Sequence, residues 1–251
     1  LVFMSKTQKL ALSIINGAIN PIPAGVVLSA PNASKLKLAL ESDAKDYSYS
    51  GLVTLGEALR GVAEQRYSWA TVKAYYATFY LARAILAYHG IGLWYWKNTP
   101  YSLSAKIGQT PKKLSGNTHD SALKLFDTSN VAPKLCNQMI GMDEAIKWLT
   151  SQRVAANYTS IKFCDPASNQ CFTKIANGSM RQFVNAYAED KYDTYYLDAD
   201  HAILAFPIEL AKLLNASYPI SLDNNERIHL KTLFKDSAGP LTSAKHFFAV
   251  V

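Results

Sequence analysis

The sequence contains few cysteines: three among its 251 residues, with no CxxC pair. Because Cys136, Cys164 and Cys171 are odd in number and widely spaced, they argue against a zinc ribbon and against a disulfide framework. We therefore expect reduced thiols, with a bridge between Cys164 and Cys171 as the alternative in an oxidising compartment. GxGxxG, GxxxxGKS/T, HExxH and nucleophile-elbow motifs are also missing, so nothing points to a dinucleotide, P-loop, zinc-protease or serine-hydrolase site. The sequence predicts no metal and no cofactor.

Long hydrophobic runs are absent as well, because no stretch reaches the ~18 consecutive apolar residues that a membrane helix needs. Residues 10–34 are uncharged and follow two lysines, as in a signal peptide, but asparagine, glycine and proline interrupt their apolar character. Met4 followed by Ser5 is typical of a natural start. We therefore expect a cytoplasmic protein without a membrane partner.

Runs of five or more like charges are missing too, although the overall balance is basic. The chain has 26 Lys and Arg residues against 19 Asp and Glu residues, which gives a net charge of +7 and a pI of about 9.1. Such a balance attracts polyanions such as RNA or DNA. A merely solvated surface explains the same charges. Charge therefore favours a nucleic-acid partner without requiring one.

Hydrophobic spacing predicts an all-α protein, a helical bundle with additional N- and C-terminal helical elements. Residues 52–65 carry one apolar stripe. Residues 69–88 are apolar on two sides, as in a helix at the centre of a bundle. The other predicted helices cover residues 7–19, 118–127, 131–139, 142–157, 179–190, 199–215 and 223–235. Between the helices we expect a loop-rich lead-in up to about residue 50, a connector at 91–113, and an extended loop or short hairpin at 159–179.

These elements divide the chain into three parts: a lead-in at residues 1–50, a helical core at 51–158, and a helical elaboration at 159–251 packed on the core. Ser68 is a candidate N-cap for the central helix. Asp198 and Asp223 are candidate caps for the last two helices.

Three polar or aromatic clusters each have two interpretations. The aromatic residues 94–96 either pack over the end of the core or offer stacking surfaces for bases or a small molecule. The tyrosine-rich stretch at 187–196 has acidic neighbours, which favour a packing or dimer surface over a polyanion site. His201 follows Asp198 and Asp200, a pattern that fits a metal site but also helix capping.

Three segments, in the same order, resemble one branch of the HEPN family. Residues 69–86, with the sequence WATVKAYYATFYLARAIL, resemble its YYAxFxxARAxL helix. Residues 118–126, with His119 ahead of a Leu-Phe pair, are similar to its next segment, and residues 153–158, RVAANY, resemble its RxxADY signature. The resemblance covers residues 66–158 and leaves both ends of the chain outside it.

The resemblance implies a helical bundle that often dimerises and that, in many members, cleaves RNA without a metal. Such members use an arginine and a histidine separated by four to six residues near a helix end. The histidine takes the proton of the ribose 2′-hydroxyl, and the arginine stabilises charge on the phosphate. HEPN domains are common in prokaryotic RNA-targeting defence and toxin–antitoxin systems.

The catalytic pattern is incomplete after Arg153. The expected histidine is missing, and Asn157 and Tyr158 occupy the corresponding stretch. Neither is a ready base, because asparagine does not titrate and tyrosine has an ordinary pKa of about 10.

Three other residues could supply the missing chemistry. Arg83 and His89 have the nominal spacing, but on an ideal helix they are rotated by about 240° relative to each other. They share a site only if the helix end unwinds or a dimer mate contributes; otherwise Arg83 is structural and His89 caps the helix. His119 is a further candidate base, or else a capping or loop residue paired with Asp120.

The candidate catalytic residues are therefore Arg83, His89, His119, Arg153 and Tyr158. The first functional hypothesis is a HEPN-like protein that binds RNA and acts as a metal-independent endoribonuclease. The second is a catalytically inert helical scaffold that forms a homodimer or docks onto a partner protein.

Overall fold

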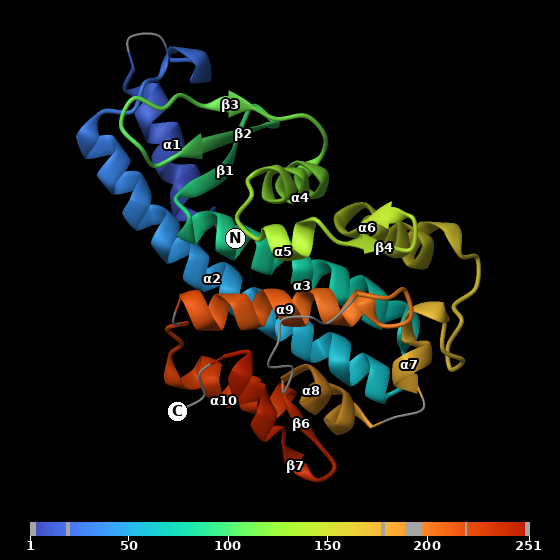
Figure 1. The fold of residues 1–251 in the computed structure, drawn as a ribbon. Helices are drawn as coiled ribbons and strands as arrows, with labels where there is room; N and C mark the ends of the chain where they lie inside the picture. Colours follow the sequence, from blue (N-terminus) through green and yellow to red (C-terminus); the bar gives the residue numbers. More distant parts are fainter. Residues whose placement is uncertain (1–3, 19–20, 177–178, 189–196, 219, 249–251) are drawn as a thin grey trace. The chain divides into compact units, whose positions relative to one another are not determined.

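The computed structural model describes residues 4–18, 21–176, 179–188, 197–218 and 220–248, and it is mainly helical (Figure 1). The chain forms two compact units. The first unit comprises residues 1–47 and 82–131, and the second comprises residues 48–81 and 132–251. The helices α2 (Ala30–Ala63) and α3 (Tyr67–Tyr88) each contribute one part to either unit.

The first unit combines helices with a small antiparallel sheet. Besides its parts of α2 and α3, it contains α1 (Lys6–Asn16), η1 (Pro23–Gly25), β1 (Ile91–Trp96), β2 (Thr99–Ser104), β3 (Lys112–Lys113) and α4 (Thr118–Thr128).

The beginning of α1 is held by a buried carboxylate of α2. Asp43, only 2% exposed, accepts hydrogen bonds from the backbone N–H groups of Lys6 (2.7 Å) and Thr7 (2.8 Å). These groups belong to the first turn, which has no partner inside the helix, and a negative charge there also suits the helix dipole. Further along α1, the Gln8 amide exchanges two hydrogen bonds of 2.8 Å with the backbone of Tyr95 in β1. The helix is thereby attached to both α2 and the sheet.

The loop-rich lead-in predicted up to residue 50 is wrong, because α2 begins at Ala30. Leu36, Leu40 and Ala44 follow one another at intervals of one helical turn and are at most 2% exposed. They pack in one hydrophobic cluster with Ile15 of α1. The polar residues between them mask this narrow apolar stripe in the sequence.

The connector predicted at 91–113 is instead a three-stranded antiparallel sheet in the order β1-β2-β3. Trp96 pairs with Thr99, which leaves a two-residue loop of Lys97 and Asn98, both with positive φ, as a type I′ hairpin turn requires. The packing interpretation of the aromatic patch is confirmed for Trp94, which is 1% exposed and stacks on Tyr101 at 5.3 Å. The Trp94 ring is therefore not available to a base or a small molecule.

The described part of the second unit is mainly helical, with two short antiparallel strand pairs. Besides its parts of α2 and α3, it contains α5 (Pro133–Cys136), β4 (Met139–Ile140), β5 (Asp143–Glu144), α6 (Ala145–Val154), the π-helical turn η2 (Ala155–Thr159), η3 (Gln170–Phe172), α7 (Thr173–Ala176), α8 (Met180–Ala188), α9 (Ala202–Ser217), α10 (Asn224–Leu233), β6 (Lys235–Asp236), β7 (Gly239–Pro240) and η4 (Thr242–His246). The helix predicted at 131–139 is only the short α5, and the helix predicted at 142–157 begins at Ala145 and continues from α6 through η2. Of the two alternatives predicted for 159–179, the loop is present at residues 160–169, and the short helical turns η3 and α7 follow it.

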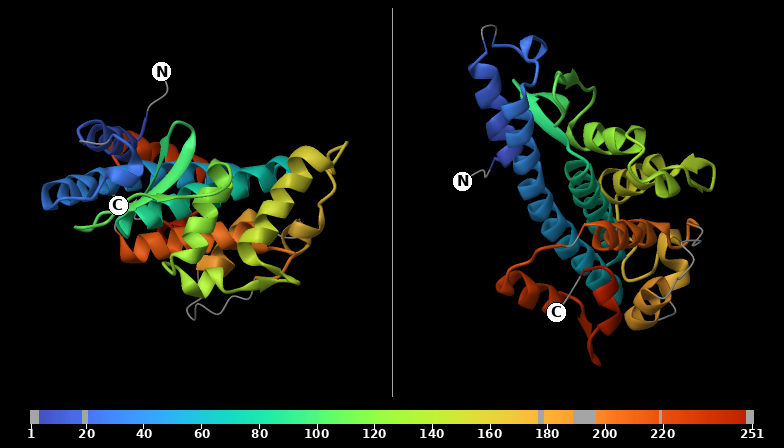
Figure 2. Two further views of the ribbon diagram at one scale, coloured as in Figure 1. Left: turned by 90° about the horizontal axis from the view of Figure 1, so that it is seen from above. Right: turned by 60° about the vertical axis from the view of Figure 1, so that its left-hand side comes forward.

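The prediction that residues 69–88 form a buried helix is confirmed by α3. In the second unit, Ala74, Tyr75 and Ala77 of this helix are fully buried. Gly51 of α2 faces Leu81 so closely that an added Cβ would lie 2.7 Å from the leucine side chain. Both views in Figure 2 place α9 beside these parts of α2 and α3. Helix α9 is buried on nearly all sides, as expected of a central helix.

The start of α3 is stabilised from another part of the second unit. The predicted cap Ser68 lies inside the first turn, and its N–H donates to the carboxylate of Asp165 at 3.2 Å. Asp223 is the cap predicted for α10, and it forms a complete capping box with Glu226. The cap predicted at Asp198 is wrong, since the N-cap of α9 is His201, whose side chain makes no capping hydrogen bond to the start of the helix.

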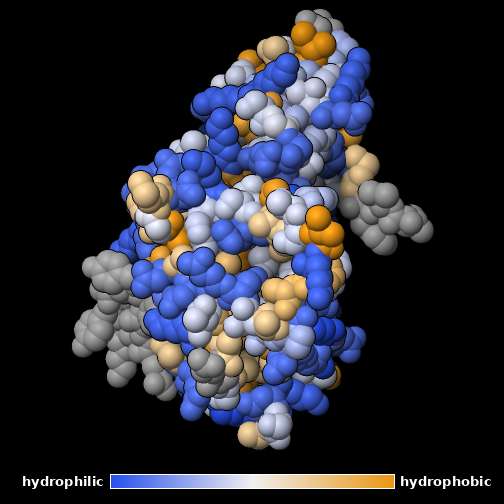
Figure 3. Space-filling model, turned by 90° about the vertical axis from the view of Figure 1, so that its right-hand side faces the viewer, coloured by the Kyte–Doolittle hydropathy of each residue, from blue (hydrophilic) through white to orange (hydrophobic). Residues whose placement is uncertain are grey.

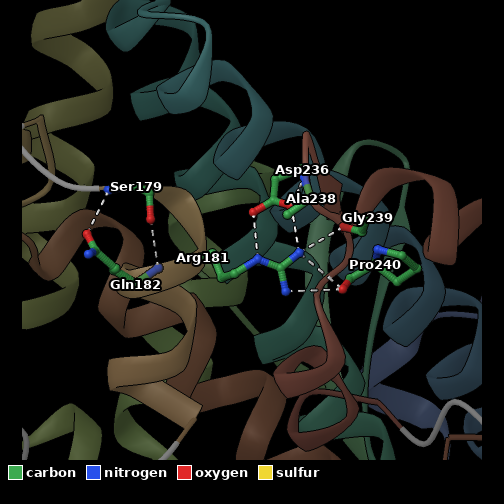
Figure 4. A network of polar contacts seen from close by, with 7 residues as sticks. All are labelled: Ser179, Arg181, Gln182, Asp236, Ala238, Gly239 and Pro240. Carbon is green, nitrogen blue, oxygen red and sulfur yellow. Dashed lines mark hydrogen bonds and ion pairs between the residues drawn. The ribbon is translucent and has the colours of Figure 1, made fainter.

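A bidentate ion pair fastens α8 to the β6–β7 hairpin (Figure 4). Arg181 donates from Nε and Nη2 to the two carboxylate oxygens of Asp236, at 2.9 and 2.6 Å. Nη2 also reaches the carbonyl of Gly239 at 3.1 Å. At the start of α8, Ser179 and Gln182 exchange side-chain to backbone hydrogen bonds, as in a capping box.

The structure tests part of the interpretations given for His201 and for the tyrosine-rich stretch at 187–196. His201 is fully buried, and its Nδ1 lies 2.5 Å from a carboxylate oxygen of Asp200. Across the described ranges, no group of three or more His, Cys, Asp or Glu side chains is placed to hold a metal. Tyr187 is buried against His201, whereas residues 189–196 of the tyrosine-rich stretch lie outside the described residues.

The face drawn in Figure 3 is mostly hydrophilic, with small, separate hydrophobic patches. Among the described helices, none combines the length and the apolar character needed to cross a bilayer. None of the three cysteines forms a disulfide; Cys136 and Cys171 are buried, and Cys164 is exposed.

Candidate functional site

The second unit brings Arg153 together with three tyrosines. The guanidinium carbon of Arg153 lies 5.4 Å from the ring centre of Tyr75, 5.9 Å from that of Tyr76 and 5.2 Å from that of Tyr158. These distances fall within the ~6 Å at which a cation is attracted to an aromatic face. We refer to these four residues as the Arg153 cluster.

Two local structures build the cluster. Tyr75 and Tyr76 are consecutive in α3, so their side chains point about 100° apart, and their rings meet edge to face at 5.8 Å. Arg153 lies in the last turn of α6, and the π-helical turn η2 follows directly after Val154. This wider turn returns the chain so that Arg153 Nη2 donates to the Tyr158 hydroxyl at 3.4 Å. Single π-helical turns are frequent at functional sites.

The cluster has a buried side and an open side. Tyr75 is fully buried, whereas Tyr158 is 69% exposed. Arg153 is half-buried, and its Nε is enclosed without a hydrogen-bond partner among the described residues. A guanidinium carries five N–H donors, so donors remain for an external acceptor.

The electrostatics keep Arg153 charged. Burial, the largest single influence, acts to lower the pKa of Arg153, but a hydrogen bond to Tyr76 and the charge interactions with all three tyrosines together raise it above its ordinary value. A group held in this form is a permanent cation and cannot accept a proton. The cluster is therefore suited to binding an anion beside an exposed aromatic ring, and no member has the ordinary pKa of a general base near neutral pH.

Arg83 lies in the first unit, where its side chain contacts a different tyrosine, Tyr47. Its guanidinium lies 4.2 Å from the ring centre of Tyr47 and donates a 2.5 Å hydrogen bond to the Tyr47 hydroxyl. Burial raises the pKa of Tyr47, and Arg83 partly opposes this shift. These contacts join α3 to α2 within the first unit, as the structural interpretation of Arg83 predicts.

The two candidate histidines also belong to the first unit. His89 is exposed just beyond the end of α3, where its backbone N–H donates to the carbonyl of Ile85, and partial desolvation lowers its pKa. His119 is half-buried in the first turn of α4. Asn117 caps this helix by accepting from the N–H groups of His119 and Asp120.

Of the five predicted site residues, Arg153 and Tyr158 thus lie together in the second unit, and Arg83, His89 and His119 lie in the first. The part played by Tyr75 and Tyr76 is not among the sequence predictions, because helical periodicity predicts only packing for the side chains of a central helix. The signal was present in the sequence, since both tyrosines stand in one of the three segments that carry the family resemblance.

Comparison with known proteins leaves the Arg153 cluster to be interpreted from its own geometry. A scan against protein-family models, a search of curated proteins and a search of solved structures each find nothing that matches this chain.

Proposed function

We propose that this chain is a HEPN-like, cytoplasmic RNA-binding protein of a prokaryotic defence or toxin–antitoxin system. The observation that carries the proposal is the contact of Arg153 with Tyr75 and Tyr76. Two segments that resemble separate HEPN motifs, far apart in the sequence, meet through their most distinctive side chains.

The chemistry of the Arg153 cluster supports RNA as the ligand. A guanidinium binds phosphate through paired hydrogen bonds, and an exposed tyrosine ring can stack on an unpaired base. Arg153 and Tyr158 supply both features five positions apart in the chain. The net charge of +7 favours the approach of a polyanion.

Metal-independent cleavage is the stronger form of the proposal. It requires a base at the ribose 2′-hydroxyl, and His89 and His119 remain the candidates for that role. Cleavage would therefore require a histidine from outside the Arg153 cluster, such as one contributed by a second copy of the chain.

The second candidate function is a catalytically inert scaffold that forms a homodimer or docks onto a partner protein. The observation that favours it is the aromatic enclosure of Arg153, which supplies no base. If the protein is a scaffold, RNA stays intact, and light scattering detects a stable dimer or complex.

Binding is tested with fluorescently labelled single-stranded RNA titrated over a salt series. Arg153→Gln should weaken binding by roughly tenfold and reduce the dependence of log affinity on log salt by about one phosphate contact. Lys147→Gln is the matched control, because Lys147 is an exposed cation of the same helix whose side chain is 72% exposed. Equal losses in the two variants would mean that only net charge matters and would reject a site at Arg153.

Cleavage is tested by incubating the protein with a mixed RNA pool and EDTA. Fragments ending in a cyclic phosphate that disappear in His89→Ala or His119→Ala would support the enzyme. Intact RNA together with specific binding would leave the RNA-binding proposal in place and reject the ribonuclease. Circular dichroism of each variant shows whether the fold is retained.

A further inference from the structure

A second concave site lies in the second unit, between α2, α3 and α10. The groove has a volume of about 510 Å³, which is within the range of ~300–1,000 Å³ typical of small-molecule sites. Its lining includes Arg60, Arg66, Trp69 and Lys73. We call it the Trp69 groove.

The walls of the groove are basic. Lys73 forms an ion pair with Glu57 at 2.5 Å, while Arg60 (3.8 Å) and Arg66 share a single carboxylate, that of Glu64. Three cations therefore face two carboxylates, which leaves an excess of one positive charge. All three basic side chains are between 44% and 60% exposed, so an anion can reach them.

The same groove presents an aromatic surface. Trp69 is 51% exposed although it belongs to a largely buried helix. Phe163 supports it edge to face at 6.0 Å, so the indole is held on one side while about half of its surface stays open. Exposed tryptophan beside arginine is the combination with which proteins bind unpaired bases.

Two small residues, Gly61 and Ala70, line the groove. An added Cβ on Gly61 would lie 3.3 Å from the Cβ of Ala70, so α2 and α3 approach closely there and no large side chain fills the space. The space between Trp69 and the basic wall therefore stays open.

We propose that the Trp69 groove binds a nucleoside phosphate, either as a free mononucleotide or as one nucleotide of a single-stranded RNA. The base stacks on Trp69. The phosphate pairs with Arg60 and Arg66, whose single shared carboxylate leaves guanidinium N–H groups for a second acceptor. Each part of the ligand should bind more weakly alone, because an isolated sugar phosphate lacks the stacking surface and a nucleoside lacks the charge.

The groove and the Arg153 cluster lie along one side of α3. Trp69, Lys73 and Tyr76 are separated by four and three residues, so they share a face of the helix, and the helical rise places Trp69 and Tyr76 about 10 Å apart along the axis. An RNA strand bound at Arg153 would therefore meet a second basic and aromatic site within a few nucleotides. The groove proposal does not depend on this strand, because a free nucleotide needs only the groove.

Calorimetric titration with AMP, adenosine, ribose 5-phosphate and a ten-nucleotide RNA tests the proposal. AMP should bind more tightly than adenosine or ribose 5-phosphate. Trp69→Ala should weaken AMP binding by roughly tenfold or more, the loss expected when base stacking is removed, and Trp69→Phe should retain most of the affinity. Arg60→Gln with Arg66→Gln should weaken AMP binding and leave adenosine unchanged.

Trp96→Ala is the control, because Trp96 lies on β1 in the first unit and should not affect binding. Saturable AMP binding that depends on Trp69 supports a free nucleotide as the ligand. Binding of the RNA alone, again weakened by Trp69→Ala, supports an RNA nucleotide. The absence of Trp69-dependent binding of either ligand at concentrations up to about 1 mM would overturn the proposal. Loss of RNA binding in Arg153→Gln with AMP binding retained would separate the two sites.

Discussion

Arg153 lies with its guanidinium carbon 5.4 Å from the ring centre of Tyr75, a residue that is itself fully buried. A cation that is normally hydrated is here held against the wall of the core. The contact orders α6 relative to α3 within the second unit and gives the Arg153 cluster a rigid base.

Tyr75 should contribute strongly to the stability of the folded protein. Tyr75→Ala removes a fully buried ring and should lower the free energy of unfolding by about 3–5 kcal/mol. Tyr75→Phe keeps the ring and should cost only about 1 kcal/mol. Urea denaturation followed by circular dichroism measures both. A cost below about 1 kcal/mol for Tyr75→Ala would contradict the buried position of this residue.

The close approach of α2 and α3 in the second unit should make Gly51 intolerant of a side chain. In Gly51→Ala the new Cβ would meet Leu81 at 2.7 Å. Overpacking costs about 1–3 kcal/mol and the better helix propensity of alanine returns about 1 kcal/mol, so we expect a net loss of about 1 kcal/mol.

Thermal unfolding of Gly51→Ala can be compared with Gly17→Ala, whose Cβ would make only ordinary contacts, the nearest at 3.4 Å. The control should be unaffected. Adding Leu81→Ala should recover part of the loss that is due to the clash, and strictly additive effects would argue against the contact.

The β1–β2 hairpin should be improved by glycine in its turn. Asn98 has a φ of 66°, a conformation that costs a residue with a Cβ about 1–2 kcal/mol unless the side chain compensates. Asn98→Gly should therefore raise the free energy of unfolding by about 0.5 kcal/mol, and Asn98→Val should lower it by about 1 kcal/mol. Chemical denaturation of the two variants gives opposite signs if the turn is type I′.

The ion pair between Arg181 and Asp236 should make stability depend on acid pH. Hydrogen bonding to Arg181 is the main cause that holds the pKa of Asp236 below its ordinary value of 3.8. A lowered pKa stabilises the folded state above the unfolded value, and this contribution is lost as pH falls below about 3.8.

Asp236→Asn should therefore destabilise the protein near neutral pH and have progressively less effect as the pH is lowered through this range. Urea denaturation from pH 7 to pH 3 measures the difference from the unmodified protein. Because the pair is partly exposed, added salt should reduce the effect. A cost that is the same at all pH values would show that the carboxylate charge is not involved.

The sequence predicts the fold best where many apolar residues recur along a helix. The central helix was placed within two residues of α3 because Trp69, Val72, Tyr76 and Phe79 leave no other regular interpretation. The first half of α2 was missed because its buried stripe is narrow and lies among lysines and serines.

The sheet was missed for a related reason. Its turn has Lys97-Asn98 in place of the Asn-Gly or Asp-Gly pair that marks a type I′ hairpin, and its strands carry aromatic residues that also suit a connector. The site was only partly predictable, because a motif gives residue types and not partners. The contact of Arg153 with Tyr75 depends on how two helices pack, and the Trp69 groove depends on a surface tryptophan that periodicity assigns to the core.

The tryptophans are distributed so that each unit has its own optical reporter. Trp94, enclosed beneath Tyr101, and Trp96 belong to the first unit, whereas Trp69 and Trp148 belong to the second. Variants that keep only one pair would emit from one unit at a time. Their denaturation curves would reveal whether the helices shared by the two units make them melt in a single transition or allow one to open while the other stays folded.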